Sequence, residues 1–269
     1  MSNRADIDST ALIKHIIGEI GITLRRPWRI LHLVNTPKLL SYLRFNKFRI
    51  RTGEQWSSCN KVKQLSVRKI ECYKFYTELQ AMKLEYIDLA SHEVRFRKVL
   101  RERLKDLYFI KSDQAVLCLG ARLGAEVKAF LDLGCFAIGI DLNPGLKNKY
   151  VLYGDFHDLQ FATDSIDILY TNSLDHVLDL SKMVKEMRRV LKRTGHIIVE
   201  SDPGTEENDK VQPDMWQTLS WKKIDDLVKA LETFGLKLIN RQSFEYPRGG
   251  EQLVFIINEL QEENVMVGG

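Results

Sequence analysis

Short apolar runs alternate with amphipathic helical stretches over residues 113–258. The predicted strands are 115–119, 136–140, 150–153, 166–170, 196–200, 236–244 and 252–258, and the predicted helices are 125–133, 180–191 and 220–234. Alternating β and α units predict an α/β fold with a Rossmann-like, mostly parallel sheet, and the last two strands predict a C-terminal antiparallel pair. Ligands of such folds bind at the carboxyl ends of the strands.

The first 108 residues follow a different pattern. Apolar residues of 60–108 recur at three- and four-residue steps, which predicts two or three helices. The segment 22–51 is basic and amphipathic, with no acidic residue between Glu19 and Glu54. We therefore interpret 1–108 as a helical N-terminal extension or cap, 109–260 as the α/β domain and 261–269 as a tail. The basic segment is typical either of a solvated cap or of a contact with an anionic membrane.

Composition narrows the classes of protein only a little. The chain is 44% hydrophobic and 28% charged, as globular proteins are, and its net charge of +4 is too small to indicate nucleic-acid binding. No apolar run approaches the roughly 20 residues of a membrane-spanning helix, and we recognise no secretory signal. The expected location is the cytoplasm, with a peripheral membrane contact as an alternative. The four cysteines form no CxxC pair, and no metal site is expected.

A glycine-containing turn follows the first strand of the α/β region. The sequence Val116-Leu-Cys-Leu-Gly-Ala-Arg-Leu-Gly-Ala-Glu126 runs from a strand into Gly120, and Gly124 then opens a helix. Glycines let the chain turn sharply and let a ligand approach the helix N-terminus, although such a turn can also exist without a ligand.

Two carboxylates follow at the ends of the next two strands. Asp141 lies about twenty residues further on, where an acidic side chain accepts hydrogen bonds from a ribose. Asp155 ends the third strand, where it could accept the exocyclic amine of adenine. Features at three consecutive strand ends predict one adenosine-binding crevice.

Residues 113–200 resemble the class I S-adenosylmethionine-dependent methyltransferase superfamily. The matching stretches are VLCLGARLGAE, AIGIDLNP, VLYGDFHDLQFATDSIDILYTNSLDHVLD and EMRRVLKRTGHIIVES. The resemblance implies S-adenosylmethionine as cofactor. It also implies that Gly120 and Gly124 frame the methionine portion, and that Asp141 binds the ribose. The resemblance further implies that Leu142 lies against the adenine face and that Asp155 and the Phe156 amide contact the adenine edge. Asn172, which follows the fourth strand, is expected to approach the cofactor through its own backbone.

Two positions depart from the family pattern. Cys118 stands where an acidic residue is common, and a thiol cannot anchor an ammonium group as a carboxylate does. Arg122 stands where a glycine is common. Arg122 could meet the methionine carboxylate in a charge-assisted bond, or it could pair with Glu126 one turn on for structural reasons alone.

Methyl transfer is an in-line displacement, so the protein must hold the acceptor in line with the methyl group and sometimes remove a proton. His176 follows the fourth strand and is a candidate general base, with Asp175 as a second candidate; His176 could equally be a packing residue. The loop 201–219 could form a lid over the acceptor or be a surface loop.

The acceptor is expected to carry a hydroxyl group, on a small molecule, a sugar or glycan, or a lipid-linked intermediate. The Asn-Pro-Pro-aromatic element of amino-methylating relatives does not follow the fourth strand, and the α/β region has no basic stripe for a nucleic acid. A non-catalytic binding protein is an alternative. A nicotinamide-dependent oxidoreductase should show G-x-G-x-x-G, but this chain has Arg122 and Ala125 there. The oligomeric state does not follow from the sequence.

Overall fold

The structure is a computed structural model that describes residues 55–258 apart from 60, 61, 63, 87–89, 209, 210 and 212. The fold described below is that of the unit that begins at Trp56. The basic segment 22–51 and the tail 261–269 lie outside the described residues, so the cap and the membrane contact stay predictions. In the described part of the chain, no helix is long and apolar enough to cross a membrane.

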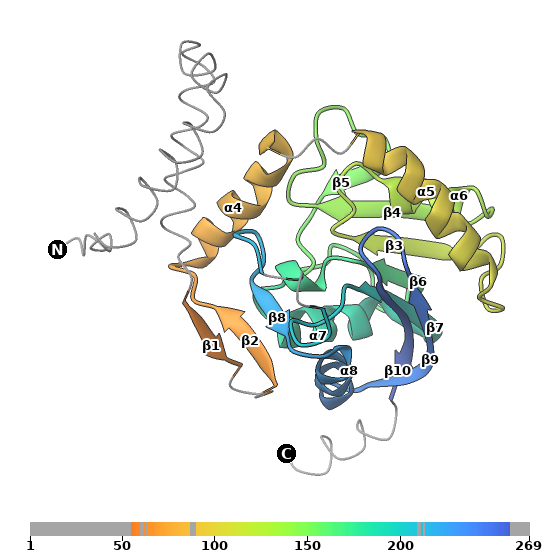
Figure 1. Ribbon diagram of the computed structural model, residues 1–269. Helices are drawn as coiled ribbons and strands as arrows, with labels where there is room; N and C mark the ends of the chain where they lie inside the picture. The colour runs from red at the N-terminus through yellow and green to blue at the C-terminus, as the bar shows by residue number, and fades with distance from the viewer. Residues whose placement is uncertain are drawn as a thin grey trace. The chain divides into compact units, whose positions relative to one another are not determined.

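A seven-stranded sheet forms the centre of this unit (Figure 1). In sequence its strands are β3 (Ala115–Leu119), β4 (Phe136–Asp141), β5 (Val151–Tyr153), β6 (Ile166–Thr171), β7 (Leu191–Ser201), β9 (Leu236–Phe244) and β10 (Gly250–Ile257). Their spatial order is β5-β4-β3-β6-β7-β10-β9. The first five strands of that order are parallel, whereas β10 is antiparallel to both β7 and β9. The predicted α/β class with a C-terminal antiparallel pair is confirmed.

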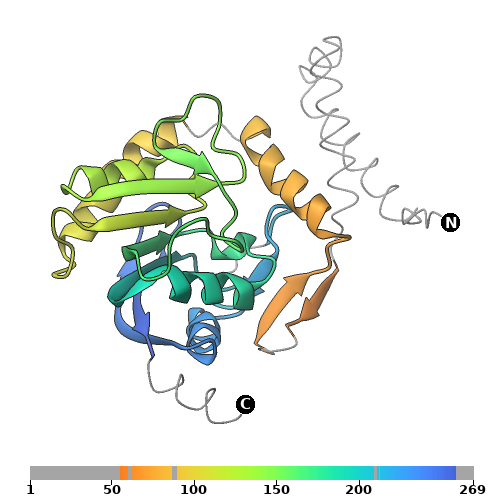
Figure 2. The ribbon, with the colours of Figure 1, turned by 180° about the vertical axis from the view of Figure 1, so that it is seen from behind.

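Helices cover both faces of the sheet (Figures 1 and 2). The helices α5 (Ala90–Lys105) and α6 (Ala125–Leu131) pack on one face, and α7 (Leu180–Val190) and α8 (Ile224–Thr233) pack on the other. Side chains alternate along β3: Val116 and Cys118 point to the α5–α6 side, and Leu117 and Leu119 to the α7–α8 side. The strand is therefore buried on both faces, as its continuous apolar run predicts.

The region before α5 is only partly helical. The helix α4 (Tyr73–Tyr86) and α5 confirm two of the predicted helices, but β1 (Trp56–Ser58) and β2 (Leu65–Arg68) are strands. They form a three-stranded antiparallel sheet with β8 (Leu219–Trp221). The helical interpretation of 60–108 therefore fails at 65–68, and the helix predicted over 220–234 begins instead at Ile224. Leu65 pairs with Trp221 across most of the chain, a contact that local periodicity does not encode.

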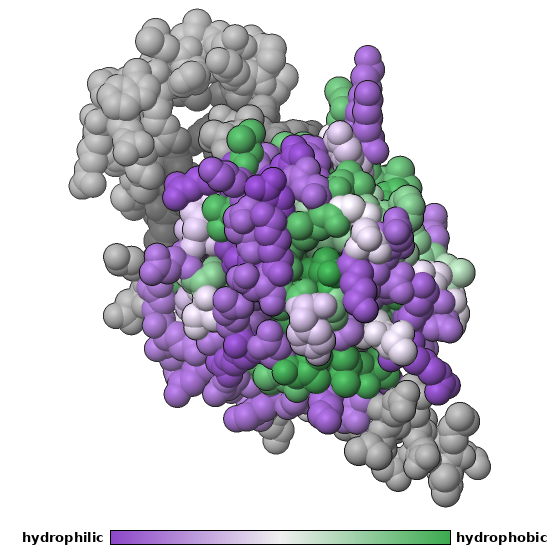
Figure 3. All heavy atoms as spheres, turned by 90° about the vertical axis from the view of Figure 1, so that its right-hand side faces the viewer, coloured by the Kyte–Doolittle hydropathy of each residue, from purple (hydrophilic) through white to green (hydrophobic). Residues whose placement is uncertain are grey.

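The surface of the described unit mixes polar and apolar residues. Figure 3 views the side that lies on the right in Figure 1 and shows hydrophilic residues over much of that face, with hydrophobic residues between them. Scattered apolar residues of this kind are ordinary on protein surfaces.

A buried ion pair connects α5 to β7. The guanidinium of Arg103 donates two hydrogen bonds to the Glu200 carboxylate, at 2.9 and 2.7 Å. The carboxylate also accepts from Tyr170 Oη at 3.1 Å and from Gln252 Nε2 at 3.0 Å. The Glu200 side chain is only 3% exposed, so every part of this network is needed to offset the cost of burying its charge.

Replacing Arg103 with Met should leave the Glu200 charge buried and unpaired. We expect the free energy of unfolding to fall by about 3 kcal/mol, measured by urea denaturation. The double variant R103M/E200Q should recover part of that loss because it removes the orphaned charge. The exposed Lys222–Glu206 pair provides the control, because K222M should leave stability unchanged. A loss in R103M no larger than in K222M would contradict this account.

Candidate functional site

Two pockets open where the parallel strands end. The first, here called the glycine-loop pocket, encloses about 490 Å³ of space that is partly open to solvent. It is lined by Tyr76, Gln80, Lys83, Gly120, Arg122, Asp141, Leu142, Gly154, Phe156, Ser173 and His176. Residues predicted for the site line this pocket from the ends of β3, β4 and β5: they are Gly120, Arg122, Asp141, Leu142 and Phe156, and His176 lines it as well. Three side chains of α4 also line the pocket, and no sequence motif had indicated them.

The turn after β3 adopts a left-handed backbone at three positions. The φ angles are +71° at Gly120, +45° at Arg122 and +86° at Gly124. A Cβ added at Gly120 would lie 2.8 Å from the Ser173 side chain, so this position also requires the absence of a side chain. Arg122 thus adopts a left-handed backbone conformation that favours glycine.

Asp141 holds the turn from the end of β4. Its Oδ2 accepts a hydrogen bond from the Arg122 amide at 3.0 Å, and its Oδ1 accepts one from the Asn143 amide at 2.8 Å. Burial raises the pKa of this carboxyl group despite the two bonds. Asp141 is thus fixed at the pocket wall, and its role in ribose recognition stays a prediction.

Asp155 is engaged within the protein. Its Oδ1 accepts hydrogen bonds from the His157 amide and lies 2.8 Å from His157 Nδ1, and its Oδ2 accepts from the Tyr73 hydroxyl. Burial opposes ionisation, but the bonds from His157 and Tyr73 hold the pKa of Asp155 below its usual range. Gly154 and Phe156, on either side of it in sequence, line the pocket. In this state Asp155 anchors α4, and adenine recognition by its side chain stays a prediction.

The helix α4 covers the glycine-loop pocket. Tyr76, Gln80 and Lys83 follow one another at helical spacing and face it. Tyr76 Oη donates to the His176 carbonyl at 3.0 Å, and Gln80 Nε2 donates to the Trp216 carbonyl at 2.7 Å. These bonds connect α4 to both the segment after β6 and the loop before β8.

His176 lies in the short 3-10 helix η1 (Leu174–His176) and is almost fully enclosed. Its Nδ1 is 3.0 Å from the Trp216 carbonyl oxygen, which can only accept, so we assign the proton to Nδ1. The Nε2 lone pair then faces Lys83 Nζ at 2.5 Å. Burial lowers the pKa of His176 to about 4 and that of Lys83 to about 7. The imidazole is therefore neutral at physiological pH.

The Arg122 guanidinium forms no hydrogen bond and no ion pair within the described part of the chain. The alternative in which it pairs with Glu126 is not observed, because Glu126 Oε1 accepts instead from Asn172 Nδ2 at 3.2 Å. Burial raises the pKa of Glu126 to about 8. Arg122 is left as a cation at the pocket wall.

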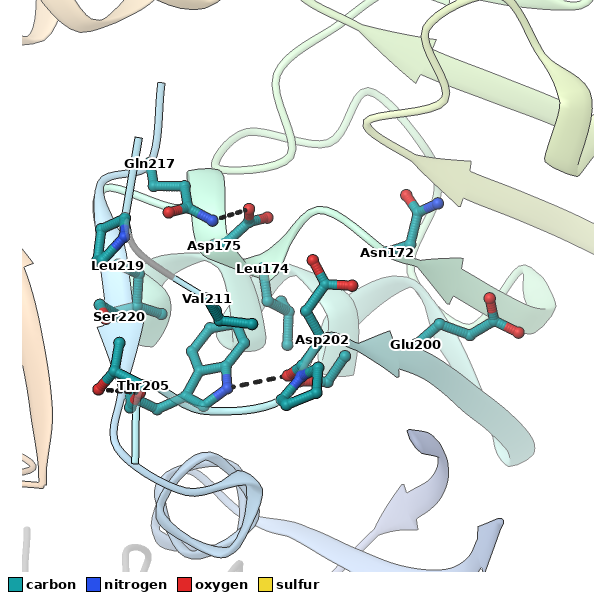
Figure 4. Close-up of a pocket in the computed structure, with 14 residues that line it drawn as sticks. Asn172, Leu174, Asp175, Glu200, Asp202, Thr205, Val211, Gln217, Leu219 and Ser220 are labelled. Atoms are coloured by element: carbon teal, nitrogen blue, oxygen red, sulfur yellow. Dashed lines mark hydrogen bonds between the residues drawn. The ribbon is translucent and has the colours of Figure 1, made fainter. Parts of the chain in front are cut away.

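The second pocket, here called the strand-end pocket, lies at the ends of β6 and β7 and encloses about 440 Å³ (Figure 4). Its walls come from the segment after β6, the end of β7 and the loop that leads to β8; the lining residues used below are Asn172, Leu174, Asp175, Asp202, Ser220 and Trp221. Asp175 accepts from Gln217 Nε2 at 2.8 Å, and Trp221 Nε1 donates to the Asp202 carbonyl at 3.2 Å (Figure 4).

The loop 202–218 is tied down at its C-terminal end. The buried Arg68 donates to the Gln217 and Asp214 carbonyls at 2.8 and 2.5 Å, and the Thr218 amide donates to the Asp175 carbonyl at 2.8 Å. This part of the loop forms a wall of the strand-end pocket. A lid function for the rest of the loop stays a prediction.

Comparisons with known proteins agree with this geometry. Residues 117–199 match the family model described as "Methyltransferase domain". The comparison with curated proteins found no match.

Solved structures with the same fold include several methyltransferases. A putative methyltransferase of Haloferax volcanii, solved with the Trm112 activator, has 17% identity, a TM-score of 0.52, and coverage of 68% of this chain and 98% of that one. The PH0226 protein of Pyrococcus horikoshii has 22% identity, a TM-score of 0.51, and coverage of 69% and 100%. The 1,6-didemethyltoxoflavin-N1-methyltransferase of Burkholderia thailandensis, solved with 1,6-didemethyltoxoflavin and S-adenosylhomocysteine, has 12% identity, a TM-score of 0.53, and coverage of 77% and 100%.

At these identities the structural likeness concerns the fold, while the family model covers the strands and turns that build the glycine-loop pocket. Residues 117–199 therefore form a methyltransferase domain with the fold of class I S-adenosylmethionine-dependent methyltransferases, and the protein is an S-adenosylmethionine-dependent methyltransferase.

Proposed function

We propose that this enzyme methylates a hydroxyl group of a small molecule, a sugar or glycan, or a lipid-linked intermediate. The observation that carries the proposal is the way two pockets share one short segment after β6. Ser173 and His176 line the glycine-loop pocket, whereas Asn172, Leu174 and Asp175 line the strand-end pocket. We call this shared segment the partition; in-line transfer requires the acceptor oxygen to reach the methyl carbon directly beside it, on the side opposite the sulfur.

The residues of the glycine-loop pocket fit the cofactor. Asp141 presents a carboxylate for the ribose hydroxyls, and Leu142 and Phe156 provide apolar surface for adenine. Gly120 keeps the main chain open to close approach, and the unpaired Arg122 guanidinium is available for the methionine carboxylate. When bound, the cofactor supplies an electrophilic methyl group, and the chain's own residues bind and orient it.

The strand-end pocket fits a small acceptor with polar groups. Apolar surface comes from Leu174, Leu219 and Trp221, and polar groups come from Asp175, Asp202 and Ser220. The similar fold from Burkholderia thailandensis was solved with 1,6-didemethyltoxoflavin, which supports an acceptor of small-molecule size. The segment Asn172-Ser-Leu-Asp175 lacks the element typical of amino-methylating relatives, which favours oxygen as the methylated atom.

Asp141 can be tested through binding alone. D141A should weaken both S-adenosylhomocysteine and 5′-methylthioadenosine by roughly 10- to 100-fold, because both ligands contain the ribose whose charged partner is lost. Isothermal titration calorimetry measures both affinities. D132A, at a surface ion pair with Arg97, is the matched control and should bind normally. Unchanged affinity in D141A would place the ribose elsewhere.

Arg122 should affect only one of these two ligands. R122Q removes the charge but keeps a polar side chain, and it should weaken S-adenosylhomocysteine by about 10-fold. Binding of 5′-methylthioadenosine should not change, because that ligand lacks the amino-acid portion. An equal loss for both ligands in the same calorimetric assay would show that Arg122 supports the turn rather than the carboxylate.

The acceptor pocket can be tested by filling it. S220Y introduces a ring into the strand-end pocket and should reduce methyl transfer at least 10-fold while affinity for S-adenosylhomocysteine stays the same. Transfer is measured with radiolabelled S-adenosylmethionine and extract separated into small-molecule, glycan and lipid fractions. The labelled methyl group should stay on the product in alkali, as in a methyl ether. Its release by alkali, as from a methyl ester, or its recovery as an N-methylamine would contradict hydroxyl methylation, and full activity of S220Y would contradict the pocket.

A further inference from the structure

Lys83 is a buried cationic side chain on the wall of the glycine-loop pocket. It projects from α4, is 9% exposed, and has the imidazole of His176 as its hydrogen-bond partner. No carboxylate in the described part of the chain forms an ion pair with it. An amine buried in this way is not explained by packing, because an apolar residue would fill the same position without the cost of desolvation.

The surroundings of Lys83 place it at the partition between the two pockets. His176 Nδ1 donates to the Trp216 carbonyl, so Nε2 is an acceptor and Lys83 Nζ lies 2.5 Å from it. Asp175 Oδ2 lies 3.6 Å from the same Nε2. Lys83 and His176 line the glycine-loop pocket and Asp175 lines the strand-end pocket, so this cluster borders both the donor and the acceptor.

The surroundings of Lys83 bring the pKa of its amine close to neutral pH. Burial, and then the positive charge of Arg122, lower its pKa to about 7, against the opposing charges of Asp175, Asp214 and Asp141. His176 stays neutral, since burial lowers its pKa to about 4. Burial opposes the ionisation of Asp175, but the charge of Lys83, the hydrogen bond from Gln217 and the charge of Arg122 hold its pKa below the usual range. The cluster at neutral pH therefore contains an ionised carboxylate, a neutral imidazole and an amine that is partly unprotonated.

We propose that Lys83 removes the proton from the acceptor hydroxyl, and that His176 is a positioning residue that holds the Lys83 amine at the partition. The acceptor oxygen forms a bond to the methyl carbon while the methyl–sulfur bond breaks and its electron pair stays on sulfur. The hydroxyl proton passes to Nζ, and the products are the methyl ether, S-adenosylhomocysteine and a lysine ammonium ion. The Asp175 carboxylate stabilises that ion until it returns the proton to solvent.

This inference rests on the proposed hydroxyl methylation and changes the role that the sequence suggested for His176. The imidazole was predicted as the base itself, but its available nitrogen already accepts from Lys83. The lysine was missed because the sequence gives α4 only a helical pattern and does not show which strand end it covers.

The protonation of Lys83 can be measured without an acceptor. Protein labelled with carbon-13 and nitrogen-15 in lysine gives side-chain NMR signals, and the signal lost in K83R identifies Lys83. Its titration midpoint should lie near pH 7, well below the ordinary lysine value of 10.5. H176Q should move the midpoint, because the group that holds the amine changes. An ammonium that persists above pH 9 would overturn the proposal.

Kinetics test the proton transfer itself, with the active extract fraction as acceptor. The rate of transfer at saturating cofactor should rise with pH through about 7 in the wild type, because the unprotonated amine is the active form. K83M and K83R should both lose at least roughly 100-fold in kcat and keep their affinity for S-adenosylhomocysteine. K83R separates the proposal from a purely electrostatic role, since arginine keeps the charge but cannot act as a base at this pH. K74M, an exposed lysine of α4, is the matched control and should behave as wild type.

Two outcomes separate a failure of the role of Lys83 from a failure of the proposed function. An active wild type with an equally active K83R overturns the role of Lys83 alone. A wild type that binds S-adenosylhomocysteine but methylates no fraction overturns the proposed function, and the role of Lys83 with it.

Discussion

The site depends on the hydrogen bond between the Asp141 carboxylate and the amide of Arg122. That amide belongs to a turn whose backbone is left-handed at Gly120, Arg122 and Gly124, a conformation that costs free energy at any residue other than glycine. The carboxylate joins the end of β4 to the turn after β3, so two neighbouring strand ends form one rigid wall. The same carboxylate is the partner proposed for the cofactor ribose, which makes turn geometry and cofactor binding inseparable.

The cover over this wall is built from distant parts of the chain. Helix α4 is fixed by Tyr73 to Asp155, by Tyr76 to the segment after β6 and by Gln80 to the loop before β8. The small sheet of β1, β2 and β8 anchors the same loop, with the buried Arg68 donating to its carbonyls. The covering elements thus depend on the α/β domain for their position, and α4 and the strand ends together line the glycine-loop pocket.

Charge distribution distinguishes the two pockets. The glycine-loop pocket is lined by the cationic side chains of Arg122 and Lys83 together with the Asp141 carboxylate, whereas the charged residues that line the strand-end pocket are Asp175, Glu200 and Asp202. The segment 172–176 lines both pockets: Ser173 and His176 line the glycine-loop pocket, and Asn172, Leu174 and Asp175 line the strand-end pocket. A single short element after β6 therefore contributes residues to both proposed ligand sites.

The sequence by itself determined the parts of this protein whose signals are local. Apolar runs of strand length predicted the parallel sheet and its antiparallel end, and the spacing of Gly120, Gly124 and Asp141 predicted the crevice, because each of these signals lies within a few residues or one β–α unit. Only the tertiary structure decided the rest. The pairing of Leu65 with Trp221, the engagement of Asp155 by Tyr73 and the contact of Lys83 with His176 each join segments more than 80 residues apart. Such contacts are selected by the burial of whole elements against one another, and no local pattern of hydrophobic and polar residues records which partners will meet.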